Sequence, residues 1–208
     1  MAVSLKECIM GQFQHYIFKN NMPYLDEYDK ILYCKKNSCD NVLVICDILS
    51  DGNTQGLPIM FHEYFVKAEI MYLGNVDKRS IVDNYPRITH VNMNAYKMDS
   101  LLIMENCRYD FIIDDGAHKL EDQLFIAKNY FHLINDWGLL IIQDIHKLED
   151  AHKILDATEP KPFHYNIVDI NGKDIFIVLY KNGPDEDIYG VEGGMNFSPH
   201  LIETDSDN

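Results

Sequence analysis

From Asn41 onward, the chain alternates between short, almost entirely apolar runs and longer amphipathic stretches. Apolar runs of roughly four to eight residues are typical of buried strands, and amphipathic stretches of roughly ten or more are typical of helices that cover a sheet. Such alternation favours parallel strand pairing, because each helix returns the chain to the start of the next strand. We expect strands over 42–45, 69–73, 88–93, 111–113, 139–142, 163–170 and 175–180, and helices over 56–66, 120–134 and 147–157.

The last two expected strands are joined by Asn171-Gly172, a dipeptide that strongly favours a two-residue hairpin turn. The final strand pair is therefore expected to be antiparallel. The pattern as a whole predicts an α/β fold, a doubly wound Rossmann-like sheet with a C-terminal antiparallel hairpin, unlike the all-parallel dinucleotide-binding fold. We place this domain at 41–181, after a helical lead-in at 1–40 and before an acidic, loop-like tail at 182–208.

The charge of the chain excludes one class of partner. The 208 residues include 33 acidic and 18 basic side chains, so the net charge at pH 7 is −15. Nucleic-acid binding relies on clustered cations that neutralise phosphates, and we therefore expect no nucleic-acid partner. No apolar run approaches the roughly 20 residues of a membrane span, and residues 1–20 lack an apolar signal core. Together with an odd number of cysteines, five, these features predict free thiols, no membrane partner and a cytoplasmic location.

The residues most suited to chemistry lie in the segment 109–118, Tyr-Asp-Phe-Ile-Ile-Asp-Asp-Gly-Ala-His. Open α/β sheets bind ligands at the carboxyl ends of their strands, which is where Asp115 is expected. Asp144 ends the expected strand at 139–142 in the same way. Adjacent strands lie about 5 Å apart, so Asp115 and Asp144 could share one divalent cation. The alternative is that Asp115 only caps the following helix and that His118 lies on its exposed first turn.

The segment 109–118 resembles the Phe-Asp-Ile-Ile-Ile-Asp-Asp-Gly-Ser-His signature of metal-dependent sugar O-methyltransferases from macrolide and rhamnosyl-polyketide pathways. This class I S-adenosylmethionine-dependent group also includes cephalosporin-hydroxylase-like proteins. The resemblance spans roughly residues 24–181. Similar segments are 24–33 (a tyrosine-rich helix), 56–65 (a helix), 133–144 (the Leu-x-x-Gly-Gly-x-x-x-x-Glu-Asp strand) and 173–179 (the final strand).

The resemblance implies a class I methyltransferase sheet and a reaction. Asp115 and Asp144 fall on metal ligands, Gln143 stands where the family has a metal-binding glutamate, and His118 falls on the base that deprotonates the acceptor. The implied metal is Mg²⁺ or Mn²⁺, and the implied acceptor is a hydroxyl of a sugar, on a small molecule or a glycan. A cation lowers the pKa of a bound hydroxyl while a neutral imidazole takes its proton, and the alkoxide then attacks the sulfonium methyl of S-adenosylmethionine.

The resemblance also implies where S-adenosylmethionine binds. The family's glycine-rich turn aligns with 44–56, in which Cys46 replaces the first glycine. The acidic residue that holds the ribose aligns with Asn75, which can still hydrogen-bond a diol although it lacks a charge. Asn94, in the loop at 92–99, is expected beside the adenine. The complete set of predicted cofactor-binding residues is Asp47, Asp51, Gly52, Gly56, Asn75, Asp77, Asn94 and Asp114.

Two other functions remain open at this stage. The departures at Cys46, Asn75 and Gln143 also suit a methyltransferase-fold domain that binds a ligand without catalysis. Asp114 and Asp115 could instead hold the metal of a nucleotide-sugar in a glycosyltransferase, although the terminal hairpin fits that fold less well. The residues leave open whether the chain forms a homo-oligomer or is a module of a longer polypeptide, and they do not identify the acceptor.

Overall fold

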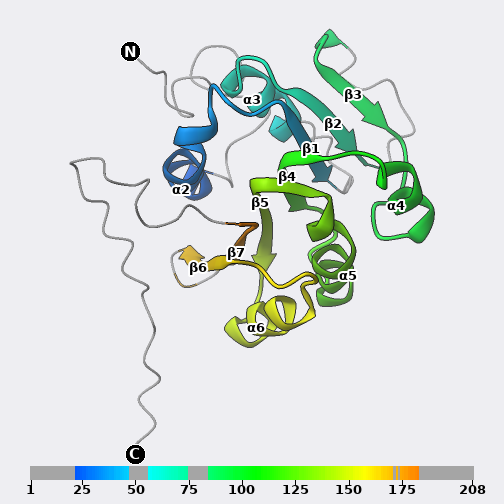
Figure 1. Ribbon diagram of the computed structural model, residues 1–208. Coiled ribbons are helices and arrows are strands. Elements are labelled where there is room, and N and C mark those ends of the chain that lie inside the picture. Colours follow the sequence, from blue (N-terminus) through cyan, green and yellow to red (C-terminus); the bar gives the residue numbers. More distant parts are fainter. Residues whose placement is uncertain (1–21, 47–55, 75–83, 171, 173, 183–208) are drawn as a thin grey trace, which may run out of the picture.

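The computed structural model describes residues 22–46, 56–74, 84–170, 172 and 174–182, which form a seven-stranded sheet in the order β3-β2-β1-β4-β5-β7-β6 (Figure 1). The strands are β1 (Asn41–Cys46), β2 (Glu69–Leu73), β3 (Ile88–Val91), β4 (Tyr109–Asp115), β5 (Ile134–Ile145), β6 (His164–Ile170) and β7 (Asp174–Tyr180). The helices are α2 (Met22–Leu32), α3 (Gly56–Tyr64), α4 (Met98–Met104), α5 (Leu120–Tyr130) and α6 (Leu148–Ala157), with short 3-10 helices η1 (Tyr33–Lys35) and η4 (Phe131–Leu133).

The strand directions match the sequence pattern. β1 pairs in parallel with β2 and β4, and the parallel pairing extends outward to β3 and β5. β7 is antiparallel to both β5 and β6. Ile170 pairs with Asp174, so three residues separate the two strands and not the expected two, and Gly172 between them has a φ of 70°, which favours glycine. The predicted α/β class with an antiparallel C-terminal hairpin is confirmed. Strand order reverses between β1 and β4, which places a ligand-binding switch point at their carboxyl ends.

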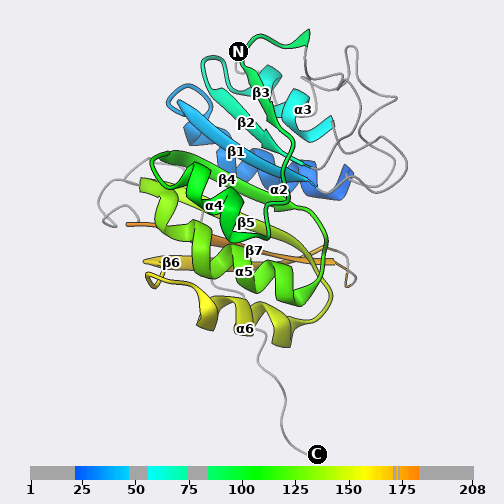
Figure 2. The same cartoon turned by 90° about the vertical axis from the view of Figure 1, so that its right-hand side faces the viewer.

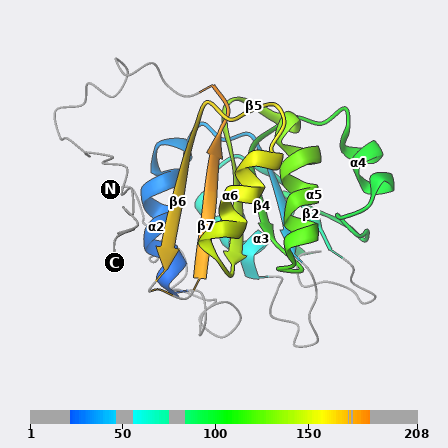
Figure 3. The ribbon, with the colours of Figure 1, turned by 90° about the horizontal axis from the view of Figure 1, so that it is seen from below.

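Helices cover both faces of the sheet. α4, α5 and α6 lie on one face, and α2 and α3 lie on the other (Figures 2 and 3). The side chains of each strand alternate between the two layers: Val42 and Val44 of β1 join the core cluster under α2 and α3, whereas Leu43 and Ile45 join the cluster under α4 to α6. Burial on both faces explains why the central strands are apolar throughout.

The helix α2 is part of the domain core. Leu25, Tyr28 and Leu32 are almost fully buried, and they pack in the same cluster as Phe61 of α3. Residues 22–40 of the expected lead-in therefore fold together with the sheet. The expected helix near 5–18 and the tail from 183 onward lie outside the described residues. No helix in the described part of the chain combines the length and apolar character needed to span a membrane.

The helix α4 and the junction of α5 with β5 differ from the sequence-based expectation. α4 was not predicted, because its apolar residues face both inward and outward: Leu101 and Met104 are buried, whereas Leu102 and Ile103 are more than half exposed. This distribution removes the one-sided periodicity that marks a surface helix. The helix expected over 120–134 ends at Tyr130, and η4 then leads directly into β5, which begins earlier than expected.

Candidate active site

The carboxyl ends of β4 and β5 bring three predicted site residues together. Asp115 is the last residue of β4, Asp144 is the second-last residue of β5, and His118 lies in the loop between β4 and α5. The two strands are paired as far as Asp114 and Ile142, so both carboxylates leave the same edge of the sheet. One possible ligand atom from each of Asp115, His118 and Asp144 lies within 4.8 Å of the other two.

The backbone at this site is bent in a specific way. His118 and Asp144 have φ angles of 53° and 55°, a left-handed conformation that costs a non-glycine residue roughly 1–2 kcal/mol. At Asp144 this bend interrupts the alternation of β5, and both Gln143 and Asp144 consequently contact tyrosines of α2. The buried amide of Gln123 on α5 supports the bend by donating to the backbone oxygen of Gln143 at 3.0 Å.

The imidazole of His118 points into the two carboxylates. Its Nε2 atom lies 3.1 Å from Oδ2 of Asp144 and 3.5 Å from Oδ1 of Asp115. This nitrogen is shielded from solvent, yet it makes no well-directed hydrogen bond with any residue that the structure describes. The two carboxylates supply oxygen ligands of the kind that Mg²⁺ and Mn²⁺ prefer, and the unsatisfied imidazole nitrogen beside them is a candidate base. The helix-capping alternative for Asp115 is not observed, since the residue before α5 is Lys119.

Burial and charge oppose each other in the cluster. Burial raises the pKa of Asp115, although the neighbouring side chains of His118 and Gln143 act in the opposite direction. For His118, burial acts to lower the pKa, but Asp115 and Asp144 outweigh it, and the pKa is raised. The side chain of His118 is 32% exposed, although its Nε2 atom is shielded. The site therefore holds excess negative charge that a cation would compensate.

Two tyrosines of α2 complete the site, and the sequence analysis did not identify them as site residues. Tyr24 donates to Oδ1 of Asp144 at 2.6 Å, while Oδ2 of the same carboxylate faces His118. Burial, followed by the hydrogen bond to Asp144, raises the pKa of Tyr24 far above its ordinary value, so the phenol stays protonated as a donor. One helical turn later, Tyr28 donates to Oε1 of Gln143. The four-residue spacing on one helix face was the available sequence signal.

Gln143 is fixed between two partners. Its side-chain oxygen accepts the Tyr28 hydroxyl, and its side chain also hydrogen-bonds Asp115. The residue is only 3% exposed. Gln143 thus lies beside the cluster, where the resemblance implies a third metal ligand, but in this arrangement its amide orients Asp115. Its role as a ligand stays a prediction.

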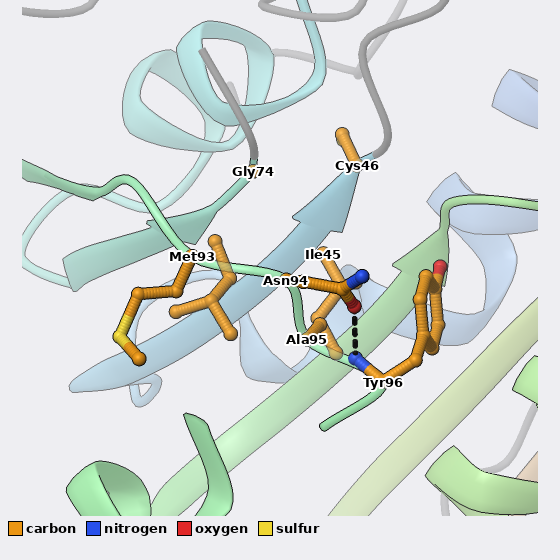
Figure 4. Close-up of a pocket in the computed structure, with 8 residues that line it drawn as sticks. Ile45, Cys46, Gly74, Met93, Asn94, Ala95 and Tyr96 are labelled. Atoms are coloured by element: carbon orange, nitrogen blue, oxygen red, sulfur yellow. Dashed lines mark hydrogen bonds between the residues drawn. The ribbon is translucent and has the colours of Figure 1, made fainter. Parts of the chain in front are cut away.

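A pocket opens at the switch point, next to this cluster. Figure 4 shows Met93 and Tyr96 at opposite sides of the pocket, with the backbone of the β3–α4 loop between them. A Cβ atom on Gly74 would lie 2.7 Å from the backbone oxygen of Cys46, so β1 and β2 approach closely only with glycine there. The pocket is lined by Ile45, Cys46, Leu73, Gly74, Met93, Asn94, Ala95 and Tyr96.

The predicted cofactor residues fall into three groups. Asn94 lines the pocket, and its side-chain oxygen accepts the backbone N–H of Tyr96 at 2.8 Å (Figure 4). Asp114 contacts the pocket-lining residue Tyr96, whose hydroxyl donates a hydrogen bond to it at 3.0 Å. Gly56 is buried at the start of α3 and does not line the pocket. Burial is the main cause that raises the pKa of Asp114 to about 7. Asp47, Asp51, Gly52, Asn75 and Asp77 lie outside the described residues.

Comparison with known proteins extends the fold assignment. No protein-family model and no curated protein matches this chain. Solved structures do match: MycE methyltransferase from the mycinamycin biosynthetic pathway, in complex with Mg, SAH and mycinamycin VI, has a TM-score of 0.64 at 18% identity. That match covers 93% of this chain and 57% of MycE, so this chain spans little more than half the length of that protein.

Two further structures match over a somewhat smaller share of this chain. N-methyltransferase NodS from Bradyrhizobium japonicum, in complex with S-adenosyl-L-homocysteine (SAH), has a TM-score of 0.52 at 7% identity and covers 78% of this chain and 89% of its own. StiE O-MT (residues 961–1257) has a TM-score of 0.52 at 14% identity, and the match covers 79% of this chain and 76% of the StiE chain. The chain has the Rossmann-like fold of class I methyltransferases.

Proposed function

We propose that this chain is an S-adenosylmethionine-dependent O-methyltransferase that methylates a sugar hydroxyl with the help of a divalent cation. The observation that carries the proposal is the juxtaposition of Asp115, His118 and Asp144 beside a pocket at the switch point of the sheet. Carboxylates and an imidazole supply what hydroxyl methylation needs, namely cation ligands and a base. The resemblance at 109–118 and the methyltransferase fold support the same reaction.

Each residue of the cluster has a separate task in this proposal. Asp115 and Asp144 would hold the cation, and Tyr24 fixes the orientation of Asp144 by occupying its second oxygen. When bound, the cation lowers the pKa of the acceptor hydroxyl. His118 accepts the hydroxyl proton on its partly exposed imidazole. Asp115 and Asp144 raise the pKa of His118, and neutralising their charge with a bound cation would favour the neutral imidazole that acts as a base.

The donor is proposed to bind at the pocket that Asn94 and Gly74 line. The narrow backbone approach at Gly74 and the polar edge of Asn94 suit the adenosine part of S-adenosylmethionine. Asp47, Asp51, Gly52, Asn75 and Asp77 are proposed to complete this site on the basis of the sequence resemblance. Support comes from MycE and NodS, which were each solved with SAH, the demethylated form of the donor.

Oxygen is the proposed methyl acceptor, and the reason is chemical. The matched folds include both an O-methyltransferase and an N-methyltransferase, so the fold alone does not select the atom. A neutral amine is already a nucleophile, whereas a sugar hydroxyl needs its proton removed. A cluster that combines cation ligands with a base therefore favours a hydroxyl. The sugar itself is proposed from the sequence resemblance, and Mg²⁺ or Mn²⁺ is proposed from the resemblance and the oxygen ligands.

Titration calorimetry tests the proposed function. SAH is titrated into the full chain with and without Mn²⁺, and micromolar affinity for SAH together with a distinct Mn²⁺ site is the expected result. Binding of SAH without methyl transfer to any rhamnoside would support a binding domain that lacks catalysis. Preferential binding of a nucleotide-sugar over SAH would support the glycosyltransferase alternative and overturn the proposal.

A further inference from the structure

Tyr96 stands between the donor pocket and the turn that follows β4. It belongs to the loop after β3, and one side of the pocket is formed by this residue (Figure 4). Its hydroxyl extends out of the pocket wall toward residues 114–117. The loop 92–99 that contains it is expected beside the adenine, but no role was assigned to Tyr96 itself, and it is not one of the cation ligands.

The hydroxyl of Tyr96 bridges the turn. It donates a hydrogen bond to Oδ1 of Asp114 at 3.0 Å, and it accepts one from the backbone N–H of Ala117 at 2.8 Å. One oxygen atom thus connects the residue just before Asp115 with the residue just before His118. These two bonds set the distance across the turn that carries both side chains.

Gly116 shows how closely the turn is fitted to this hydroxyl. A Cβ atom at position 116 would lie 1.5 Å from the Tyr96 hydroxyl oxygen, which no real contact allows. The space beside the backbone of residue 116 is therefore filled by the phenol. Tyr96 and Gly116 form one complementary pair, and neither can change without movement of the turn.

We infer that Tyr96 is a positioning residue that holds the turn at 114–118 in the geometry in which Asp115 and His118 face Asp144. The inference rests on the proposed function, because it assigns Tyr96 to the cation site of that function. Tyr96 acts through the turn and does not itself ligate the cation. Partners of this outer kind typically contribute roughly 10–100-fold to metal affinity.

The test compares Tyr96→Phe with Tyr109→Phe in the full chain. Tyr109 is the control because it lies at the start of β4, at the end of the strand opposite Asp115, and its buried hydroxyl contacts the sulfur atoms of Met71 and Met104 at 3.4 and 3.2 Å. Both variants keep the aromatic ring and lose the hydroxyl. We expect Tyr96→Phe to bind Mn²⁺ about tenfold more weakly and SAH within about twofold of wild type. Tyr109→Phe should bind both ligands like wild type, even where its melting temperature falls equally.

Equal Mn²⁺ affinity in Tyr96→Phe and wild type would overturn the inference. If Tyr96→Phe does not fold, Gly116→Ala gives a second test, because its added methyl displaces the same hydroxyl and should weaken Mn²⁺ binding to a similar extent. Failure of the proposed function has a different signature. If Tyr96→Phe shows the expected weaker Mn²⁺ binding but the wild-type chain does not bind SAH, the positioning role of Tyr96 is supported and S-adenosylmethionine is not the donor. If the wild-type chain binds SAH but no Mn²⁺, the positioning role is overturned.

Discussion

The two ends of β4 use carboxylates in opposite ways. At the start of the strand, Asp110 accepts hydrogen bonds from the backbone N–H groups of Asp40 and Asn41 at 2.7 and 3.1 Å and from the amide of Asn135 at 2.7 Å. This carboxylate ties together β1, β4 and β5. At the other end, Asp115 faces the carboxylate of Asp144 and the imidazole of His118. A carboxylate whose hydrogen bonds are supplied by the fold stabilises that fold, whereas two carboxylates placed close together favour a cation between them.

The largest expected effect is on catalysis at the carboxyl end. We expect His118→Ala to reduce methyl transfer to methyl rhamnoside by about 10²–10⁴-fold, because the alkoxide can no longer form by proton transfer to the imidazole. The affinity for SAH should stay within about twofold, since the base contacts the acceptor and not the donor. Initial rates and calorimetry measure the two quantities. A parallel loss of SAH binding would contradict the assignment.

A large effect on stability is expected at Asp114, and it depends on pH. The carboxyl has an ordinary pKa of 3.8 and a pKa of about 7 in the folded chain, mainly because of burial. The folded chain therefore holds a proton between these values that the unfolded chain releases, so stability decreases as the pH rises from 4 through 7. Asp114→Asn should be a few kcal/mol more stable than wild type at pH 8 and nearly equal at pH 4. Urea unfolding of both ligand-free chains at pH 4 and pH 8 measures the difference in their free energies of unfolding. A difference that is the same at the two pH values would contradict the raised pKa of Asp114.

Replacing aspartate by the uncharged asparagine at each end of β4 separates stabilisation of the fold from cation binding. Asp110→Asn replaces an acceptor of three hydrogen bonds and should lower the free energy of unfolding by about 1–3 kcal/mol while leaving Mn²⁺ affinity unchanged. Asp115→Asn should do the reverse: Mn²⁺ binding falls steeply, and the stability of the ligand-free chain is equal or higher because a buried charge is removed. Urea unfolding and Mn²⁺ titration of both variants measure the contrast. If both substitutions affected the same quantity, the comparison would fail.

The smallest expected effect comes from the outer support of the site. Tyr24→Phe removes the hydroxyl that donates to Asp144, and we expect Mn²⁺ affinity to fall about tenfold. Tyr33→Phe is the control from the segment that follows α2, since Tyr33 is 63% exposed and far more accessible to water. Electron paramagnetic resonance of free Mn²⁺ reports both affinities. Equal affinities in the two variants would remove Tyr24 from the site.

Local sequence patterns were sufficient to predict the fold class and the position of the two strand ends. Apolar runs that end in Asp115 and Asp144 mark strand termini directly, and parallel pairing brings such termini to one edge. The hairpin followed from the turn at Gly172 for the same reason. In each case the signal lies within a few consecutive residues, so no knowledge of tertiary contacts was needed.

The supporting residues could not be predicted, because their contacts are distant in sequence. Tyr24 is 120 residues from Asp144, and Tyr28 is 115 residues from Gln143. Tyr96 and Asp114 are only 18 residues apart, yet their hydrogen bond depends on where the β3–α4 loop packs. A tyrosine that completes a site and a tyrosine that only fills the core look alike in a single sequence. The left-handed conformation of Asp144 also has no local signal, since it depends on partners from α2 and α5.

Anomalous diffraction from a crystal of the full chain grown with Mn²⁺ and SAH tests the central claim most directly. We predict an anomalous peak within coordinating distance of the Asp115 and Asp144 carboxylates, with SAH in the pocket lined by Asn94 and Tyr96. A peak elsewhere, or none at saturating Mn²⁺ with SAH bound, would contradict a cation-assisted reaction at this cluster.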